Sequence, residues 1–154
     1  MLRTAIALFT LTVMLNARSA LGAENQLHPC EAETAKLMSI KSTWQEIYKA
    51  AIELPPHCFD GYFAEGISDT LVRKMGQEWS GFLSLLVTHP KESKFTKLVL
   101  RSINATLDPE DIRAVDRLAK SSCRAELRNY CHAISKQAAA ALADYDPPES
   151  RDGT

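Results

Sequence analysis

The chain has 154 residues, with 18 basic and 19 acidic side chains and a formal net charge of −1. This length suits one domain with one modest core and is crowded for two domains. The balanced charge argues against nucleic acid or an anionic membrane surface as a partner, because both are bound through clustered Lys and Arg. We therefore expect a protein or a small molecule as the partner.

The first 23 residues have the pattern of an export leader. Arg3 supplies positive charge, residues 5–15 form an apolar run, and Leu21-Gly22-Ala23 ends in the small residues that a signal peptidase accepts. The apolar run is shorter than the roughly 20 residues that span a bilayer, so we expect cleavage near Glu24 and no stable membrane insertion. The remaining 131 residues carry 16 basic and 19 acidic side chains, a net charge of −3, and are expected to be secreted or periplasmic.

Steps of three or four between apolar residues predict helices along most of the remaining chain. The first helix is expected over residues 31–54 and must stop at Pro55-Pro56. A second possibility is a helix over residues 44–54 only, because Thr43 and Glu46 have the spacing of a capping box. The sequence leaves both starts open.

Further helices follow with recognisable boundaries. Asp60 is suited to cap a helix with Phe63, Ile67, Leu71 and Met75 inward, in which small residues allow close packing. Gly76 permits a break before the strongly apolar residues 79–87, which are expected to be core and include Trp79. Pro90 is expected to begin a fourth helix, and Asp108-Pro109 a fifth. The last helix carries apolar residues from Leu127 to Ala141, and the tail 146–154 is expected to be disordered.

No segment alternates with period two, so the predicted fold class is all-α. We expect a single compact bundle of about five to six helices over residues 24–145, held by two disulfides. The disulfides are expected because an even number of cysteines in an exported chain usually forms bridges. The four cysteines are Cys30, Cys58, Cys123 and Cys131.

Helix geometry favours long-range bridges. An unbroken helix over residues 31–54 would hold Cys30 and Cys58 about 36 Å apart, and eight steps within one helix would separate Cys123 from Cys131 by about 12 Å. Each pairing would then join Cys30 or Cys58 to Cys123 or Cys131. The later helix start after Thr43 would weaken the first exclusion.

Signatures of metal, cofactor and catalytic sites are missing from the sequence. The four histidines are scattered, and His132 directly follows Cys131, which is not a zinc-ligand spacing. There is no Gly-x-Ser-x-Gly motif, and bridged cysteines cannot serve as nucleophiles. We expect no enzyme, no metal and no other cofactor. Asn104 lies in an Asn-x-Thr motif, which matters only in a eukaryotic secretory pathway.

Two groups of side chains are candidates for binding. Glu65, Asp69 and Arg73 lie one turn apart along one helix face, where an ordinary Asp69–Arg73 ion pair with a solvated Glu65 is favoured over a catalytic acid pair. Trp and Tyr side chains occur both in protein cores and at binding hot spots, and a core position is favoured for Trp44 and Tyr48. The candidate binding residues are Trp44, Tyr48, Asp60, Tyr62, Glu65, Asp69 and Arg73.

A leader followed by a compact acidic helical domain with two bridges resembles, in format, small bacterial periplasmic proteins, among them immunity proteins against toxins that degrade the cell wall. We expect a non-enzymatic exported protein that binds another protein, as an inhibitor or immunity factor. The alternative is a carrier of a small apolar ligand in a cavity between helices. An exposed patch favours the first function, and an enclosed apolar pocket favours the second.

Overall fold

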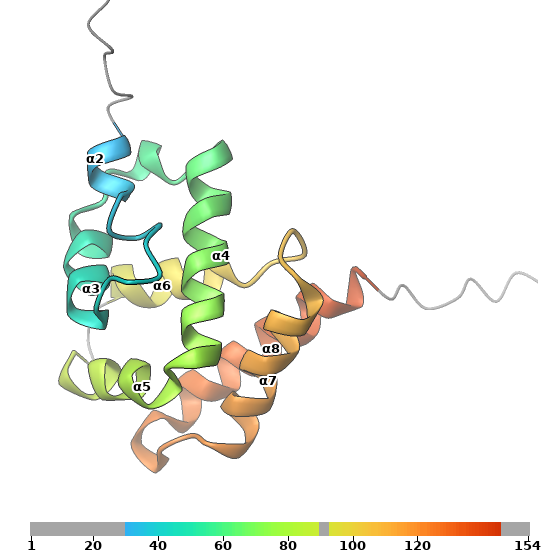
Figure 1. Ribbon diagram of the computed structural model, residues 1–154. Coiled ribbons are helices and arrows are strands. Elements are labelled where there is room, and N and C mark those ends of the chain that lie inside the picture. Colours follow the sequence, from blue (N-terminus) through green and yellow to red (C-terminus); the bar gives the residue numbers. More distant parts are fainter. Residues whose placement is uncertain (1–29, 90–92, 146–154) are drawn as a thin grey trace, which may run out of the picture.

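The computed structural model describes residues 30–89 and 93–145. Within these ranges every regular element is helical, which confirms the predicted all-α class (Figure 1). The predicted leader at residues 1–23, the helix start at Pro90 and the tail at 146–154 lie outside the described residues.

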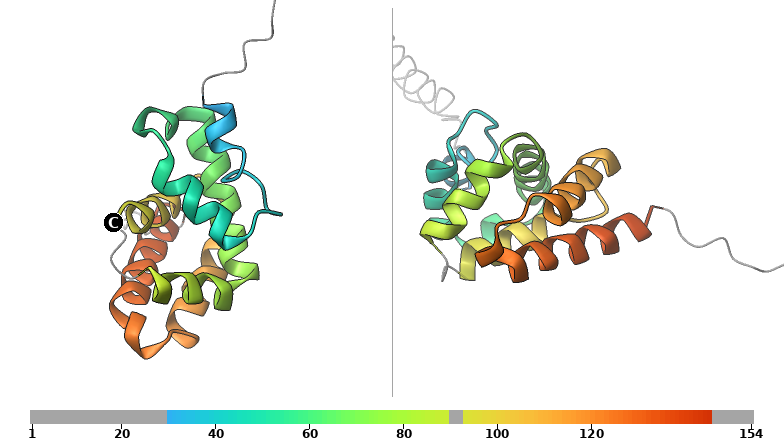
Figure 2. Two further views of the ribbon diagram at one scale, coloured as in Figure 1. Left: turned by 90° about the vertical axis from the view of Figure 1, so that its left-hand side faces the viewer. Right: turned by 90° about the horizontal axis from the view of Figure 1, so that it is seen from below.

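Seven α-helices occur in the described ranges, slightly more than expected. α4 stands in the middle, with α3, α5 and α6 on one side and the pair α7 and α8 on the other (Figure 1). α7 and α8 run side by side (Figure 2). Short 3₁₀ turns cover Pro56–Cys58 and Ala125–Leu127. The helices are α2 Glu31–Thr34, α3 Trp44–Glu53, α4 Gly61–Gln77, α5 Trp79–Thr88, α6 Ser93–Ser102, α7 Pro109–Ser121 and α8 Arg128–Ala143.

The first helix begins late. An unbroken helix over residues 31–54 is wrong, because α2 ends at Thr34 and α3 begins only at Trp44. The capping box sets this start: the Glu46 backbone N–H donates to Thr43 Oγ1 at 3.2 Å, and the Thr43 N–H donates to Glu46 Oε2 at 2.8 Å. The chain between the two helices folds back and buries Leu37 completely.

The disulfides are local, so the predicted long-range pairing is wrong. Cys30 bonds Cys58 with a Cα–Cα distance of 5.3 Å, because the break before α3 lets the chain double back. Cys123 bonds Cys131 with a Cα–Cα distance of 6.2 Å. The prediction that one helix contains both Cys123 and Cys131 is wrong, because α8 begins at Arg128 and Cys123 lies in the preceding loop.

The core gathers around the inner face of α4. Ile67, Leu71 and Met75 are fully buried, as their four-residue spacing predicts. The expected close packing along this helix is clearest at Gly66, where an added Cβ would collide with Cε of Met38. A side chain from the α2–α3 loop, not a second backbone, occupies the space.

The helix break expected at Gly76 occurs two residues later, at Glu78. Glu78 ends α4 and precedes α5, and its carboxylate accepts a hydrogen bond from Lys74 at 2.7 Å. The Lys74 ammonium is buried and also donates to the carbonyl of Ile40 at 3.2 Å. One buried cation thus joins the α2–α3 loop to the α4–α5 junction.

Candidate functional site

A groove lies between α4 and the loop that joins α6 to α7. It encloses about 530 Å³ and combines one exposed aromatic ring with three carboxylates. The lining residues are Tyr62, Glu65, Gly66, Asp69, Thr106, Leu107 and Asp108. We call this set the acidic groove.

The wall formed by α4 follows from helix geometry. Asp60 caps the helix, since its Oδ1 accepts from the Gly61 N–H at 2.8 Å. From that start, the spacing of Tyr62, Glu65 and Asp69 places them along one face. Asp60 itself does not line the groove and has a structural role as the cap.

The opposite wall is a turn held by side-chain hydrogen bonds. The Asn104 amide oxygen accepts from the Thr106 backbone N–H at 2.9 Å, and its nitrogen donates to the Ser102 carbonyl at 3.2 Å. Asp108 then caps α7 by accepting from the Glu110 N–H at 2.8 Å. The hydroxyl of Tyr145 donates to the carbonyl of Leu107. These bonds hold the turn in its conformation and tie it to the end of α8.

Negative charge dominates the groove. The predicted Asp69–Arg73 ion pair is present at 3.2 Å, with both side chains about half exposed. Asp111 lies near this pair, and partial burial together with the charges of Asp108 and Asp69 raises the pKa of its carboxyl, against the opposing effect of Arg73. The lining of the groove in the described chain holds three carboxylates and no Lys or Arg.

Tyr62 projects into solvent beside these carboxylates. Its exposed fraction is 72%, against 37% for Val87 and Tyr145, the other large exposed apolar side chains of the described chain. Its ring meets Phe63 edge-on at 5.6 Å between centroids. A large aromatic surface next to concentrated charge suits contact with another macromolecule.

Trp44 and Tyr48 do not belong to the groove. Trp44 is buried and packs against Phe82 at 5.2 Å between ring centroids. Tyr48 is half-buried and stacks on His89 at 4.1 Å. Trp44 is a core residue of α3, as favoured from the sequence, and Tyr48 packs against the core while partly buried.

Sequence reasoning missed the loop side of the groove. The sequence predicts Asp108 only as a helix cap and carries no motif that marks Thr106 or Leu107 as site residues. The available signal was the density of acidic residues around Pro109, but only the tertiary packing of α7 on α4 brings them to Glu65 and Asp69.

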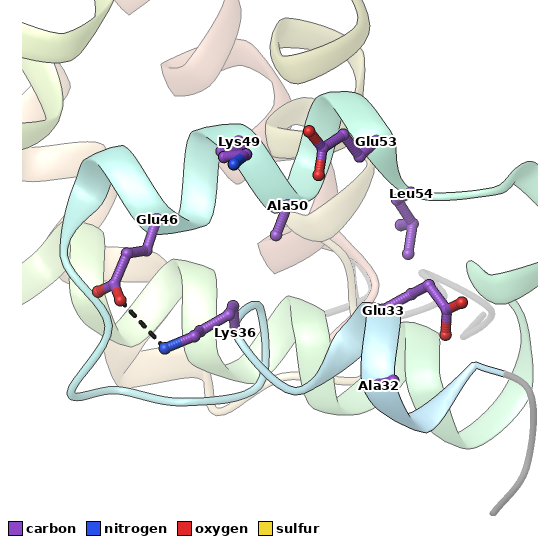
Figure 3. A pocket seen from close by; sticks show the side chains of 8 residues that line it. All are labelled: Ala32, Glu33, Lys36, Glu46, Lys49, Ala50, Glu53 and Leu54. Carbon is purple, nitrogen blue, oxygen red and sulfur yellow. Dashed lines mark hydrogen bonds and ion pairs between the residues drawn. The ribbon is translucent and has the colours of Figure 1, made fainter.

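A second groove of about 380 Å³ lies between α2 and α3 (Figure 3). Ala50 and Leu54 point from α3 toward α2, and Lys36 pairs with Glu46 at 3.0 Å. The Thr43 backbone hydrogen bond, then Lys36, lower the pKa of Glu46 to about 2. Since the Glu46 carboxylate belongs to the capping box of α3, the charged side chains of this groove have a structural role.

A smaller, more apolar cavity of about 200 Å³ lies between α3 and α6. Leu54, Phe59 and Leu98 contribute apolar surface, and the Arg101 guanidinium lies 4.5 Å from the centre of the Phe59 ring. Its volume is below the roughly 300–1,000 Å³ of typical small-molecule sites. The cavity therefore gives little support to an apolar carrier.

Among the described residues, one group has the proximity of metal ligands: Cys30, His57 and Cys58, with donor atoms within 4.8 Å of one another. Both sulfurs are joined in the disulfide, which removes their thiolate character.

In the described ranges no helix combines the length and apolarity needed to cross a membrane. No protein-family model, curated protein or solved structure matches this chain.

Proposed function

We propose that this chain is an exported, non-enzymatic helical protein that binds another protein through the acidic groove. The observation that carries the proposal is Tyr62, 72% exposed at the edge of a concave acidic surface. Tyrosine supplies a large, amphipathic contact at low entropic cost and is enriched at binding hot spots.

The charges of the groove indicate the chemistry of the partner. Glu65, Asp69 and Asp108 line it, and Arg73 pairs with Asp69. A protruding Lys or Arg of a partner would find complementary charge there, which favours fast association and correct orientation. We therefore infer a basic docking surface on the partner.

Rigidity supports the same function. The wall opposite α4 is fixed by hydrogen bonds of Asn104 and Asp108, so little ordering is required when a partner binds. An inhibitor of a secreted enzyme or an immunity factor fits a small module of this kind. The two disulfides are compatible with the oxidising compartment that such a role requires.

Quantitative binding tests the proposal. A partner is isolated on the immobilised full chain, and its Kd is measured for the wild type, Tyr62→Ala and Val87→Ala. Val87 is the matched control because it is an exposed apolar residue on α5, outside the groove. We expect Tyr62→Ala to weaken binding at least about tenfold, Val87→Ala to leave it unchanged, and added salt to weaken it. Equal affinities of the two variants would contradict the assignment of this surface.

Export is tested separately by intact mass. The protein recovered outside the cytoplasm is expected to begin within two residues of Glu24. A retained leader would overturn the export part of the proposal without affecting the groove.

A further inference from the structure

The two disulfides have different surroundings. Cys30 and Cys58 are each 1% exposed, so their bridge belongs to the core. Cys131 is 2% exposed, but Cys123 is only partly buried, and both line a surface pocket of about 490 Å³. A dissolved molecule can therefore approach one bridge and not the other.

The pocket beside Cys123–Cys131 is lined by basic side chains. Lys120, Arg128 and His132 line it together with the two sulfurs. Lys120 is paired with Asp116 at 2.6 Å, whereas Arg128 is an exposed cation at the first position of α8. Positive charge attracts anionic thiolates and also stabilises a thiolate that is released nearby.

The position of Cys131 adds to this effect. It is the fourth residue of the 16-residue helix α8, within the first turn, at the positive end of the helix dipole. Cys123 lies outside the helix, in the loop after α7. Cys123 therefore supplies the accessible sulfur, and Cys131 supplies the sulfur that is suited to leave as a thiolate.

We propose that Cys123–Cys131 is a thiol-exchange site for small anionic thiols. The thiolate attacks Cys123 Sγ and forms a mixed disulfide with it, while the bond to Cys131 breaks and its electron pair leaves on Cys131 Sγ. The exchange consumes one thiolate and releases one, so no further oxidant or reductant is required. Attack by the Cys131 thiolate on the mixed disulfide reverses it. This inference is independent of the proposed partner binding.

Opening this bridge should leave the fold intact. α7 and α8 remain packed through buried Ile112 and Val115 on one helix and Ile134 and Ala138 on the other. The change should be confined to the loop, where Trp79 Nε1 donates to the carbonyl of Ser122. Trp79 fluorescence in a Trp44→Phe background therefore reports on the opening.

The test exposes the folded full chain to glutathione, with acid quenching, alkylation of free thiols and peptide mass mapping over time. We expect Cys123–Cys131 to open at least about tenfold faster than Cys30–Cys58, with glutathione on Cys123, alkylation of Cys131 and unchanged far-ultraviolet circular dichroism. Similar rates for both bridges, glutathione mainly on Cys131, or opening in step with loss of helix would overturn the proposal.

A variant pair tests the basic pocket. Arg128→Gln is expected to slow the reaction with glutathione at least about threefold and to slow it less with the cationic thiol cysteamine. Arg117→Gln is the control, because Arg117 is an exposed arginine on α7 outside the pocket. Equal glutathione rates for the two variants would overturn the role of Arg128.

Discussion

The indole Nε1 of Trp79 donates a hydrogen bond to the backbone carbonyl of Ser122 at 3.0 Å. This contact joins the first residue of α5 to the loop after α7, across 43 positions of sequence. The ring also packs against Phe82 at 5.3 Å between centroids. Trp79 therefore combines core packing with a hydrogen bond that holds the loop in place.

Replacing Trp79 separates these two contributions. Trp79→Ala is expected to lower the free energy of unfolding by about 3 to 5 kcal/mol, as other large-to-small core substitutions do. Trp79→Phe keeps a ring but removes the donor, and the lost hydrogen bond should account for about 1 kcal/mol of its cost. Chemical denaturation measures both, and a loss below about 1 kcal/mol for Trp79→Ala would show that the ring is not a core residue.

Glu65 offers a test that separates folding from binding. Glu65→Gln should change the free energy of unfolding by less than about 0.5 kcal/mol, because the side chain is exposed. The same change should weaken the partner complex by removing one carboxylate of the acidic groove. Denaturation and Kd are measured in parallel. A large loss of stability would mean that Glu65 supports the fold instead of the interface.

The pH dependence of stability should show the contribution of Glu46. Its folded pKa of about 2 lies below the ordinary 4.5, so its ionised form stabilises the folded state above pH 4.5. As the pH falls from 4.5 toward 2, this contribution is lost. The stability difference between wild type and Glu46→Gln should therefore shrink over that window. A constant difference across it would show that the carboxylate charge is not responsible.

Two glycines should respond in opposite directions to alanine. Gly61 has φ of +48° at the start of α4, where a Cβ is disfavoured, so Gly61→Ala should cost about 1 kcal/mol or more. Gly76 lies inside α4, and an added Cβ would meet Ala114 Cβ at 3.8 Å, an ordinary contact. Gly76→Ala should stabilise the protein by about 0.5 to 1 kcal/mol. Thermal or chemical unfolding of both variants gives the signs directly.

The helices could be predicted wherever the signal lies within a few neighbouring residues of the sequence. The spacing of Ile67, Leu71 and Met75 predicted the buried face of α4, and Asp108 predicted the start of α7. The disulfides could not be predicted, because their pairing depends on where α3 and α8 begin. The Thr43 capping box was visible, but the sequence alone did not exclude an unbroken earlier helix.

The candidate site was only partly predictable for a similar reason. Helical periodicity predicted that Glu65, Asp69 and Arg73 share one face, and Tyr62 was a separate candidate whose place beside them the structure shows. Thr106 and Asp108 join them only through the packing of the α6–α7 loop on α4. The local signal predicted Asp108 as a helix cap, which is correct but incomplete, and no local signal marked Thr106 as a site residue.

Site-specific photocross-linking tests the central claim most directly. A photoreactive phenylalanine analogue is placed at Tyr62, and in a second variant at Val87, in the organism that produces the protein. The account predicts a defined adduct with one protein from position 62, mapped to a basic surface of that protein, and no such adduct from position 87. Adducts of equal yield from both positions, or none from position 62 while the partner is still captured, would contradict it.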